Sequence, residues 1–167
     1  LTYNGSVIIK ENSRPFLEYR SYTSKGYDFW FEHYSRNMDK HYVWACPDFG
    51  KPLLKYFDGK YPNGRFYYKM TDSYMLTEQD QIKIAVNMSL STDICEQTGA
   101  PRKAQAIYTL KDDGLKINLL WYGKDANRTP EAIFLHFYPC ADRCDLIKLG
   151  TEIDPESTAS MGGRNLH

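Results

Sequence analysis

The chain has 167 residues, which is long enough for one domain with its own hydrophobic core. Its 21 Lys and Arg residues balance its 21 Asp and Glu residues, so no long-range field attracts the domain to nucleic acid or to an anionic membrane. The sequence also lacks a run of about 18 consecutive apolar residues, so no segment could span a bilayer as a helix.

A short helix is predicted near the start of the chain. Residues 19–39 begin with aromatic residues at period two, as in a strand. Apolar residues then recur at spacings of three and four, at Tyr27, Trp30, Phe31 and Tyr34. This spacing predicts a helix with Ser24 or Asp28 as its cap, and we expect it to be the only substantial helix. Residues 43–63 are rich in Pro, Gly and Asp without a steady period, which predicts an ordered loop with short extended pieces.

Three strands are predicted in the middle of the chain. Residues 81–89 alternate polar residues with four apolar ones, Ile82, Ile84, Val86 and Met88. Residues 103–111 and 115–122 form two more runs, and the intervening Asp112-Asp113-Gly114 is a strong hairpin signal. In the second run, four side chains should face one core: Leu115, Ile117, Leu119 and Trp121.

Residues 131–138 are apolar on both faces of a predicted strand. Ile133, Leu135 and Phe137 lie on one face, and Ala132, Phe134, His136 and Tyr138 lie on the other. A strand of this kind belongs in the middle of a stack of sheets. Residues 146–153 predict a final short strand before a tail rich in Ser, Thr and Gly. The pattern as a whole predicts an all-β fold, an antiparallel β-sandwich with one short helix.

The cysteines do not indicate a metal site. They lie at positions 46, 95, 140 and 144. Cys140 and Cys144 could bridge across a turn or remain as two free thiols. Zinc is disfavoured because the other two cysteines are far apart and no His lies at a ligand spacing. The sequence therefore predicts no metal ligand and no cofactor in these residues.

The glycosylation sequons and the two ends of the chain indicate where the protein is found and whether the chain is part of a longer one. Three triplets fit N-glycosylation of a secreted protein, at Asn4, Asn87 and Asn127. The chain begins at Leu1 with neither an initiator Met nor a signal-peptide pattern, and ends at His167 without a closing element. We therefore expect residues 1–167 to be a single β-sandwich domain, or part of one, within a longer multidomain chain.

Polar side chains crowd the segment that precedes the strand at residues 131–138. They are Lys124, Asp125, Asn127, Arg128 and Glu131, and we call them the polar edge. In an extended chain Arg128 and Glu131 approach the same rim, where they would pair with each other, secure the loop or bind sugar hydroxyls. His136 lies between aromatic residues and is expected to be a satisfied core residue instead of a base.

The tail carries a second group of polar residues. Gly162 and Gly163 permit close backbone approach, and three side chains suited to hydroxyls or carboxylates follow them: Arg164, Asn165 and His167. The sequence has no nucleophile elbow, P-loop, dinucleotide fingerprint or H-E-x-x-H motif, so no catalytic residue is predicted.

Five motifs together resemble a known family. They are DFGKP at 48–52, TGAPR at 98–102, LWYGKDANRTPEAIFLHFYP at 120–139, LIKLGTEIDP at 146–155 and GGRNLH at 162–167. The ordered set is similar to the carboxy-terminal region of the family catalogued as domain of unknown function 5054, which is related to the α-mannosidases of glycoside hydrolase family 38. The similarity covers most of the chain, and its strongest part is the K-x-A-N-R-x-P-E-A segment at 124–132.

The resemblance implies a galactose-mutarotase-like β-supersandwich that follows an amino-terminal catalytic domain of the same chain. In family 38 enzymes the zinc ligands and the nucleophilic Asp lie in that catalytic domain, so this piece would have no catalytic residue and no cofactor of its own. The sandwich would pack on the catalytic domain and lend residues to its carbohydrate pocket. The candidates for this substrate or interface edge are Lys124, Arg128, Glu131, Arg164, Asn165 and His167.

Two other functions remain open at this stage. The chain has 14 Tyr, 8 Phe and 3 Trp, which suits either half-buried strands or surfaces that stack on sugar rings. A free-standing carbohydrate-binding module would present a flat row of exposed aromatic side chains on one sheet. A purely structural packing domain would instead have an apolar patch for a domain partner.

Overall fold

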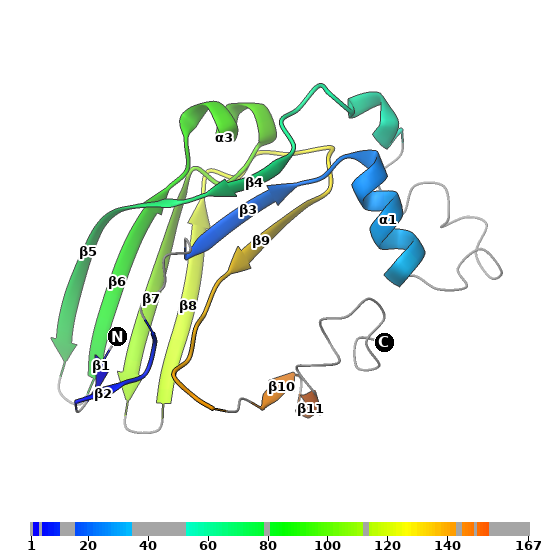
Figure 1. Cartoon of the computed structure of the whole chain (residues 1–167). Coiled ribbons are helices and arrows are strands. Elements are labelled where there is room, and N and C mark those ends of the chain that lie inside the picture. Colours follow the sequence, from blue (N-terminus) through cyan, green and yellow to red (C-terminus); the bar gives the residue numbers. More distant parts are fainter. Residues whose placement is uncertain are drawn as a thin grey trace.

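The computed structural model describes residues 2–3, 5–10, 16–34, 53–78, 81–111, 114–142, 145–148 and 150–153. Within these residues the main body is a two-layer antiparallel β-sandwich, as the sequence predicts (Figure 1). One layer has the strand order β5-β6-β7-β8, with strands Lys69–Glu78, Gln81–Ser89, Lys103–Lys111 and Gly114–Tyr122. The other has the order β4-β3-β9, with strands Gly64–Tyr67, Leu17–Ser21 and Glu131–Leu135.

The four-stranded sheet forms from strands that follow one another in the sequence. Two of its hairpins have short turns, since Glu78 of β5 pairs with Gln81 of β6, and Lys111 of β7 pairs with Gly114 of β8. The observed bounds of β6 and β7 agree with the predicted runs, and β8 begins one residue before the predicted run. Local alternation thus defines β6, β7 and β8, whereas the sequence analysis did not predict β5.

The three-stranded sheet forms from segments that are far apart in the sequence. Its central strand is β3, which pairs with β4 on one side and with β9 on the other. Within the described residues β9 lies at the edge of this sheet. The described residues form two main layers, so only one face of β9 meets another sheet, and the prediction that residues 131–138 lie in the middle of a stack of sheets is wrong. Its second apolar face is partly covered by side chains instead of by a sheet, since the Arg20 guanidinium lies 4.4 Å from the centre of the Phe134 ring.

The core lies between the two sheets. β3, β4 and β9 run obliquely across the upper part of the four-stranded sheet in Figure 1. The buried cluster comprises Leu17, Tyr19, Tyr68, Met88, Leu90, Cys95, Ala100, Ala104 and Ala106. Three of the four predicted core residues of β8 are half-buried, but Trp121 is 52% exposed. That part of the prediction is wrong, because Trp121 lies near the end of a strand at the edge of the sheet.

The predicted first helix is present as α1, Ser24–Tyr34. Its cap is Thr23 instead of Ser24 or Asp28, since Thr23 Oγ1 accepts a hydrogen bond from the Gly26 N–H at 3.2 Å. The Ser24 N–H instead donates to Asp58 Oδ1 at 2.8 Å, which ties the helix start to the loop before β4. This contact joins α1 to the sandwich.

Two further helical segments were not predicted. The described part of the 43–63 loop contains a 3₁₀ turn, η1, Leu54–Phe57. A second α-helix, α3, Thr92–Thr98, closes the end of the core between β6 and β7 (Figure 1). Its seven residues are too few to show a helical period in the sequence, so the helix was not predicted between the alternating strands that flank it.

Two small hairpins complete the described elements. β1, Thr2–Tyr3, pairs with β2, Ser6–Val7. The predicted final strand is in fact a hairpin of β10, Leu146–Lys148, with β11, Thr151–Ile153. The chain reverses between them at Gly150, whose φ of +79° favours glycine.

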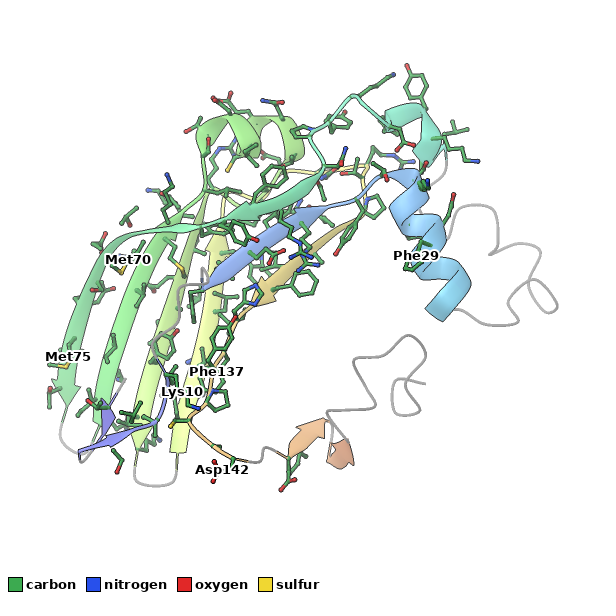
Figure 2. All side chains as sticks on the ribbon, viewed as in Figure 1. Lys10, Phe29, Met70, Met75, Phe137 and Asp142 are labelled. Atoms are coloured by element: carbon green, nitrogen blue, oxygen red, sulfur yellow. The ribbon has the colours of Figure 1, made fainter. Side chains whose placement is uncertain are left out.

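Several surface features bear on function. Met70 and Met75 on strand β5 are 66% and 68% exposed (Figure 2).

Of the four cysteines, Cys95 is a buried free thiol and Cys140 is an exposed free thiol, whereas Cys46 and Cys144 lie outside the described residues. Among the described helices, none is both long enough and apolar enough to cross a membrane.

Candidate functional site

The segment that carries the polar edge joins β8 to β9 and packs on the end of α3. The Asp125 N–H donates to the Gly99 carbonyl at 3.0 Å. Gly99 has a φ of +72°, and a Cβ at this position would lie 2.9 Å from the Asp125 carbonyl oxygen. Glycine is therefore required both by the backbone conformation and by the close approach of the loop.

Asn127 is the internal anchor of this segment. Its Oδ1 accepts hydrogen bonds from the Thr129 N–H and from the Thr129 hydroxyl, both at 2.7 Å. Its Nδ2 donates to the Thr98 carbonyl and to the Tyr19 hydroxyl, the latter at 3.2 Å. Both polar atoms of the amide are bonded within the protein, so the Asn127 sequon is used here as a structural link.

Tyr19 connects the core to the polar edge. Its side chain is fully buried, and its hydroxyl donates to Glu131 Oε2 at 2.7 Å. Burial, together with the hydrogen bond and negative charge of Glu131, raises the pKa of Tyr19 far above its ordinary value. Lys124 Nζ binds the other carboxylate oxygen of Glu131 at 2.9 Å. Glu131 therefore secures the strand end, which is one of the roles that the sequence left open.

Arg128 lies on the other side of the same segment. Its guanidinium carbon is 5.8 Å from the centre of the Phe57 ring in η1, a cation–π distance. The structure thus brings Lys124 and Glu131 into direct contact and places Arg128 beside Phe57 of η1. The three tail candidates, Arg164, Asn165 and His167, lie outside the described residues.

A polar cavity of about 290 Å³ opens at this edge. It is lined by Tyr61, by the end of α3 and by the segment before β9, with the residues Glu96, Gln97, Thr98, Gly99, Asp125, Ala126, Asn127 and Arg128. Arg102 fixes one wall, because its Nη1 donates to Asp125 Oδ2 at 2.8 Å and to the Gly123 carbonyl at 3.1 Å. The polar cavity therefore combines an aromatic ring with carboxylate, amide and guanidinium groups.

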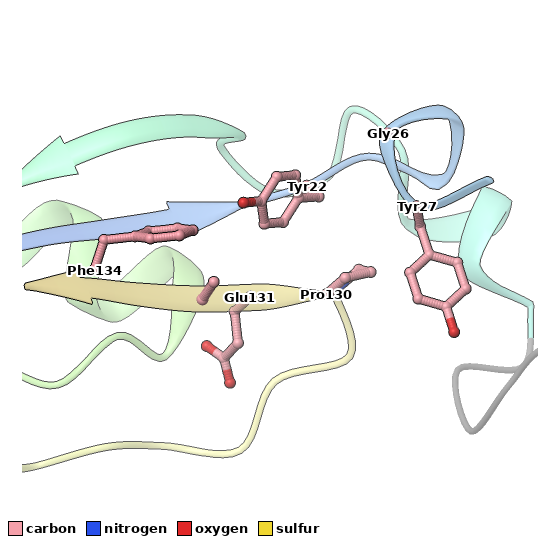
Figure 3. A pocket seen from close by; sticks show the side chains of 7 residues that line it. Tyr22, Gly26, Tyr27, Pro130, Glu131 and Phe134 are labelled. Carbon is pink, nitrogen blue, oxygen red and sulfur yellow. The ribbon is translucent and has the colours of Figure 1, made fainter. Parts of the chain in front are cut away.

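An aromatic cavity of about 400 Å³ lies beside the start of β9 and the start of α1 (Figure 3). It is lined by Tyr22, Gly26, Tyr27, Pro130, Glu131, Ala132 and Phe134. The Tyr22 N–H donates to the Pro130 carbonyl at 2.9 Å and holds the two segments together. Figure 3 shows the Phe134 ring on one side of β9 and the Glu131 side chain on the other. The segment from Asn127 to Glu131 thus separates the polar cavity from the aromatic cavity.

No pattern in the sequence indicated that the carboxylate of Glu18 is buried. This residue is 1% exposed although it alternates with the core residues Leu17 and Tyr19. Its partners are Arg20, Arg65 and His136, two of which come from other strands or from the segment after β9. His136 is accordingly a satisfied residue, as predicted, but its partner is a carboxylate on the outer face of the sheet.

No metal centre is formed by the described residues, since none of their His, Cys, Asp and Glu side chains gather in groups of three or more. A family model described as Domain of unknown function (DUF5054) matches residues 10–118, more than half of the chain. The match includes the DFGKP and TGAPR motifs and ends before the motif at 120–139. No curated protein and no solved structure matches the chain.

Proposed function

The chain belongs to the DUF5054 family, and from that premise we propose that it is the accessory β-sandwich of a carbohydrate-active enzyme related to glycoside hydrolase family 38. In this proposal the sandwich packs on an amino-terminal catalytic domain and supplies its polar edge to the carbohydrate. The relationship to family 38 rests on the resemblance of the five sequence motifs to DUF5054, and the sandwich fold is consistent with it. Zinc, where the full protein uses it, would be held by the catalytic domain.

The polar cavity is the observation that carries the proposal. Sugars are bound by an aromatic ring that stacks on their C–H face and by planar polar groups that pair with their hydroxyls. Tyr61 supplies the ring, while Asp125, Arg128 and Gln97 supply the polar groups. The Arg102 ion pair orients the Asp125 carboxylate before any ligand arrives, which lowers the entropic cost of binding.

The arrangement favours binding over catalysis. The two cavity carboxylates, Glu96 and Asp125, are both exposed to water. A glycosidase acid is instead held in a water-poor pocket close to a second carboxylate. Glu131 is already engaged by Tyr19 and Lys124. We therefore assign these residues to recognition of the sugar and leave bond cleavage to the catalytic domain.

Titration of the chain with methyl α-mannoside and with mannobiose, followed by NMR, tests this function. We expect Arg128→Ala and Asp125→Ala to weaken binding by about tenfold each, because each removes hydrogen bonds to a charged group. Lys116→Ala is the control, since Lys116 is an exposed cation on β8 of the four-stranded sheet and does not line the polar cavity.

Two outcomes contradict the proposal. Absence of any saturable binding by the wild-type chain would favour a purely structural packing domain. Equal losses in Arg128→Ala and in Lys116→Ala would show that charge alone, and not the polar cavity, governs the interaction.

One observation favours a second candidate, a free-standing carbohydrate-binding module. On the outer face of the four-stranded sheet, Asn87 Nδ2 donates to Asp72 at 2.6 Å and Gln105 Nε2 donates to Asn87 Oδ1 at 2.8 Å. Tyr74 and Tyr122 on the two edge strands of this sheet are 54% and 52% exposed. These rings flank a polar row but do not form a continuous aromatic platform, so we rank the polar cavity first.

A further inference from the structure

The end of η1 and the residues that follow it carry three aromatic rings in contact with one another. The Tyr56 and Phe57 rings meet edge to face, with their centres 5.3 Å apart. The Phe57 and Tyr61 rings are stacked, with their centres 6.0 Å apart. We call residues 56–61 the aromatic loop. In Figure 1 it is drawn in cyan and lies beside the start of α1.

The aromatic loop adjoins the polar cavity. Tyr61 is one of the residues that line this cavity. Arg128 also lines it, and its guanidinium carbon lies 5.8 Å from the centre of the Phe57 ring. Since Phe57 contacts both tyrosines, the rings form a continuous series that starts inside the cavity at Tyr61 and ends outside it at Tyr56.

The outer end of this series is open to water. Tyr56 is 67% exposed, so most of its surface is available to a ligand instead of contributing to the core. Lys60 Nζ lies 3.0 Å from the centre of the Tyr56 ring, and an ammonium group can donate hydrogen bonds to hydroxyl groups of a ligand beside that ring. An exposed ring next to a polar donor is a combination that suits a sugar.

The aromatic loop is held in place before any ligand arrives. The Ser24 N–H of α1 donates to Asp58 Oδ1 at 2.8 Å, and the Ser21 hydroxyl of β3 donates to the Pro62 carbonyl at 2.6 Å. Within the loop, the Lys60 N–H donates to the Phe57 carbonyl at 3.0 Å. Because the rings lie on a fixed backbone, little conformational entropy is lost when they bind a ligand.

The polar cavity by itself is small for an oligosaccharide. Its volume of about 290 Å³ is at the lower end of the range of small-molecule sites, which begins at about 300 Å³. A sugar chain longer than a disaccharide must therefore continue outside the cavity, and the aromatic loop lies directly beside its wall.

We propose that the polar cavity and the aromatic loop together bind an oligosaccharide longer than a disaccharide. One end of the oligosaccharide would occupy the polar cavity, and a later sugar unit would pack against Tyr56 and accept a hydrogen bond from Lys60. This inference rests on the proposed function, because it extends the sugar site at the polar cavity along the aromatic loop.

Calorimetric titration of the chain with mannobiose and mannotetraose tests the extended site. We expect mannotetraose to bind about tenfold more tightly, because it is long enough to contact Tyr56. Tyr56→Ala should weaken mannotetraose about tenfold and leave mannobiose unchanged. Tyr56→Phe keeps the ring and should bind both ligands as the wild type does. Tyr61→Ala, inside the polar cavity, should weaken both ligands.

Tyr74→Ala is the matched control, because Tyr74 is a 54% exposed tyrosine on β5 that belongs neither to the polar cavity nor to the aromatic loop. It should change the affinity for neither ligand. A Tyr56→Ala variant that keeps the preference for mannotetraose would overturn the inference, and so would a Tyr74→Ala variant that loses it.

The same titrations separate this inference from the proposed function. If mannobiose binds and Arg128→Ala weakens it, but mannotetraose binds no more tightly, the extended site alone is wrong. If neither ligand binds the wild-type chain, both the proposed function and the extended site are wrong.

Discussion

The two sheets of the sandwich differ in how far apart their partners lie in the sequence. In the four-stranded sheet, consecutive strands pair, two of the connections are tight turns and the third contains α3, and polar side chains form a row on the outer face. In the three-stranded sheet, the Tyr19 and Glu131 side chains that bond to each other are 112 residues apart. Local pattern defines the first sheet, whereas long-range side-chain contacts define the second. Both candidate cavities adjoin segments that these long-range contacts hold.

The largest expected effect is loss of the Tyr19 side chain. Tyr19→Ala removes a fully buried ring and also removes one hydrogen-bond partner each from Glu131 and Asn127, so we expect a loss of about 4 kcal/mol in the free energy of unfolding. Met88→Ala, at a buried position of the four-stranded sheet, should cost less, because it removes only apolar contacts. Urea denaturation measures both, and a larger cost for Met88→Ala would break the comparison.

Glu18→Gln should cost about 3 kcal/mol at neutral pH, because it removes the buried charge that the half-buried Arg20 and the exposed Arg65 face. The pH dependence has a definite sign. Since the pKa of Glu18 is lowered in the folded state, its stabilisation is present above the ordinary glutamate value of about 4.3 and is lost as the pH falls through the folded pKa. Chemical denaturation between pH 3 and pH 7 should therefore show a steeper acid loss for the wild type than for the variant. Parallel profiles would contradict this role for Glu18.

A pair of glycine variants tests the close approach of the loop to α3. Gly59→Ala introduces a side chain at a φ of +75° with no atom nearby, so it should cost about 1 kcal/mol. Gly99→Ala has nearly the same φ but also meets the Asp125 carbonyl, so it should cost at least about 1 kcal/mol more. Thermal unfolding of the two variants separates the cost of the backbone conformation from the cost of the steric contact. Equal melting temperatures would contradict the close approach of the Asp125 carbonyl to Gly99.

The smallest effect is expected on the outer face of the four-stranded sheet. Gln105→Ala removes hydrogen bonds to Asn87 and Tyr74, but these groups can bond to water instead. We expect a loss of about 0.5 kcal/mol in unfolding free energy, measured in urea. A loss comparable with that of Glu18→Gln would mean that the two sheets do not differ as described.

The part of the fold that could be predicted from the sequence is the part set by local rules. The alternation in β6 and β7 and the turn before Gly114 specify three strands with nearly correct bounds and the pairing of β7 with β8. The three-and-four spacing after residue 24 likewise specifies α1. Trp121 was placed on the correct face by alternation, but alternation does not show where the opposing sheet ends.

The candidate site was predicted only as a gathering of polar residues. The crowding of Lys124, Asn127 and Glu131 before β9 indicated an edge, and the structure shows that two of these residues bond to Tyr19. Nothing local in the sequence links Tyr19 to that edge, or Glu18 to its partners, because each pairing depends on β3 lying beside β9. The apolar run of β9 was misplaced for the same reason, since its outer face is only partly covered, by the Arg20 guanidinium over Phe134, and not by a second sheet.

The most direct test of the central claim is an NMR titration of the isotope-labelled chain with mannobiose, observed at each backbone amide. The account predicts that chemical-shift changes concentrate at residues 96–102 and 123–128, around the polar cavity. Changes centred instead on residues 72–74, 87, 105 and 120–122 would place the sugar on the outer face of the four-stranded sheet and contradict the account.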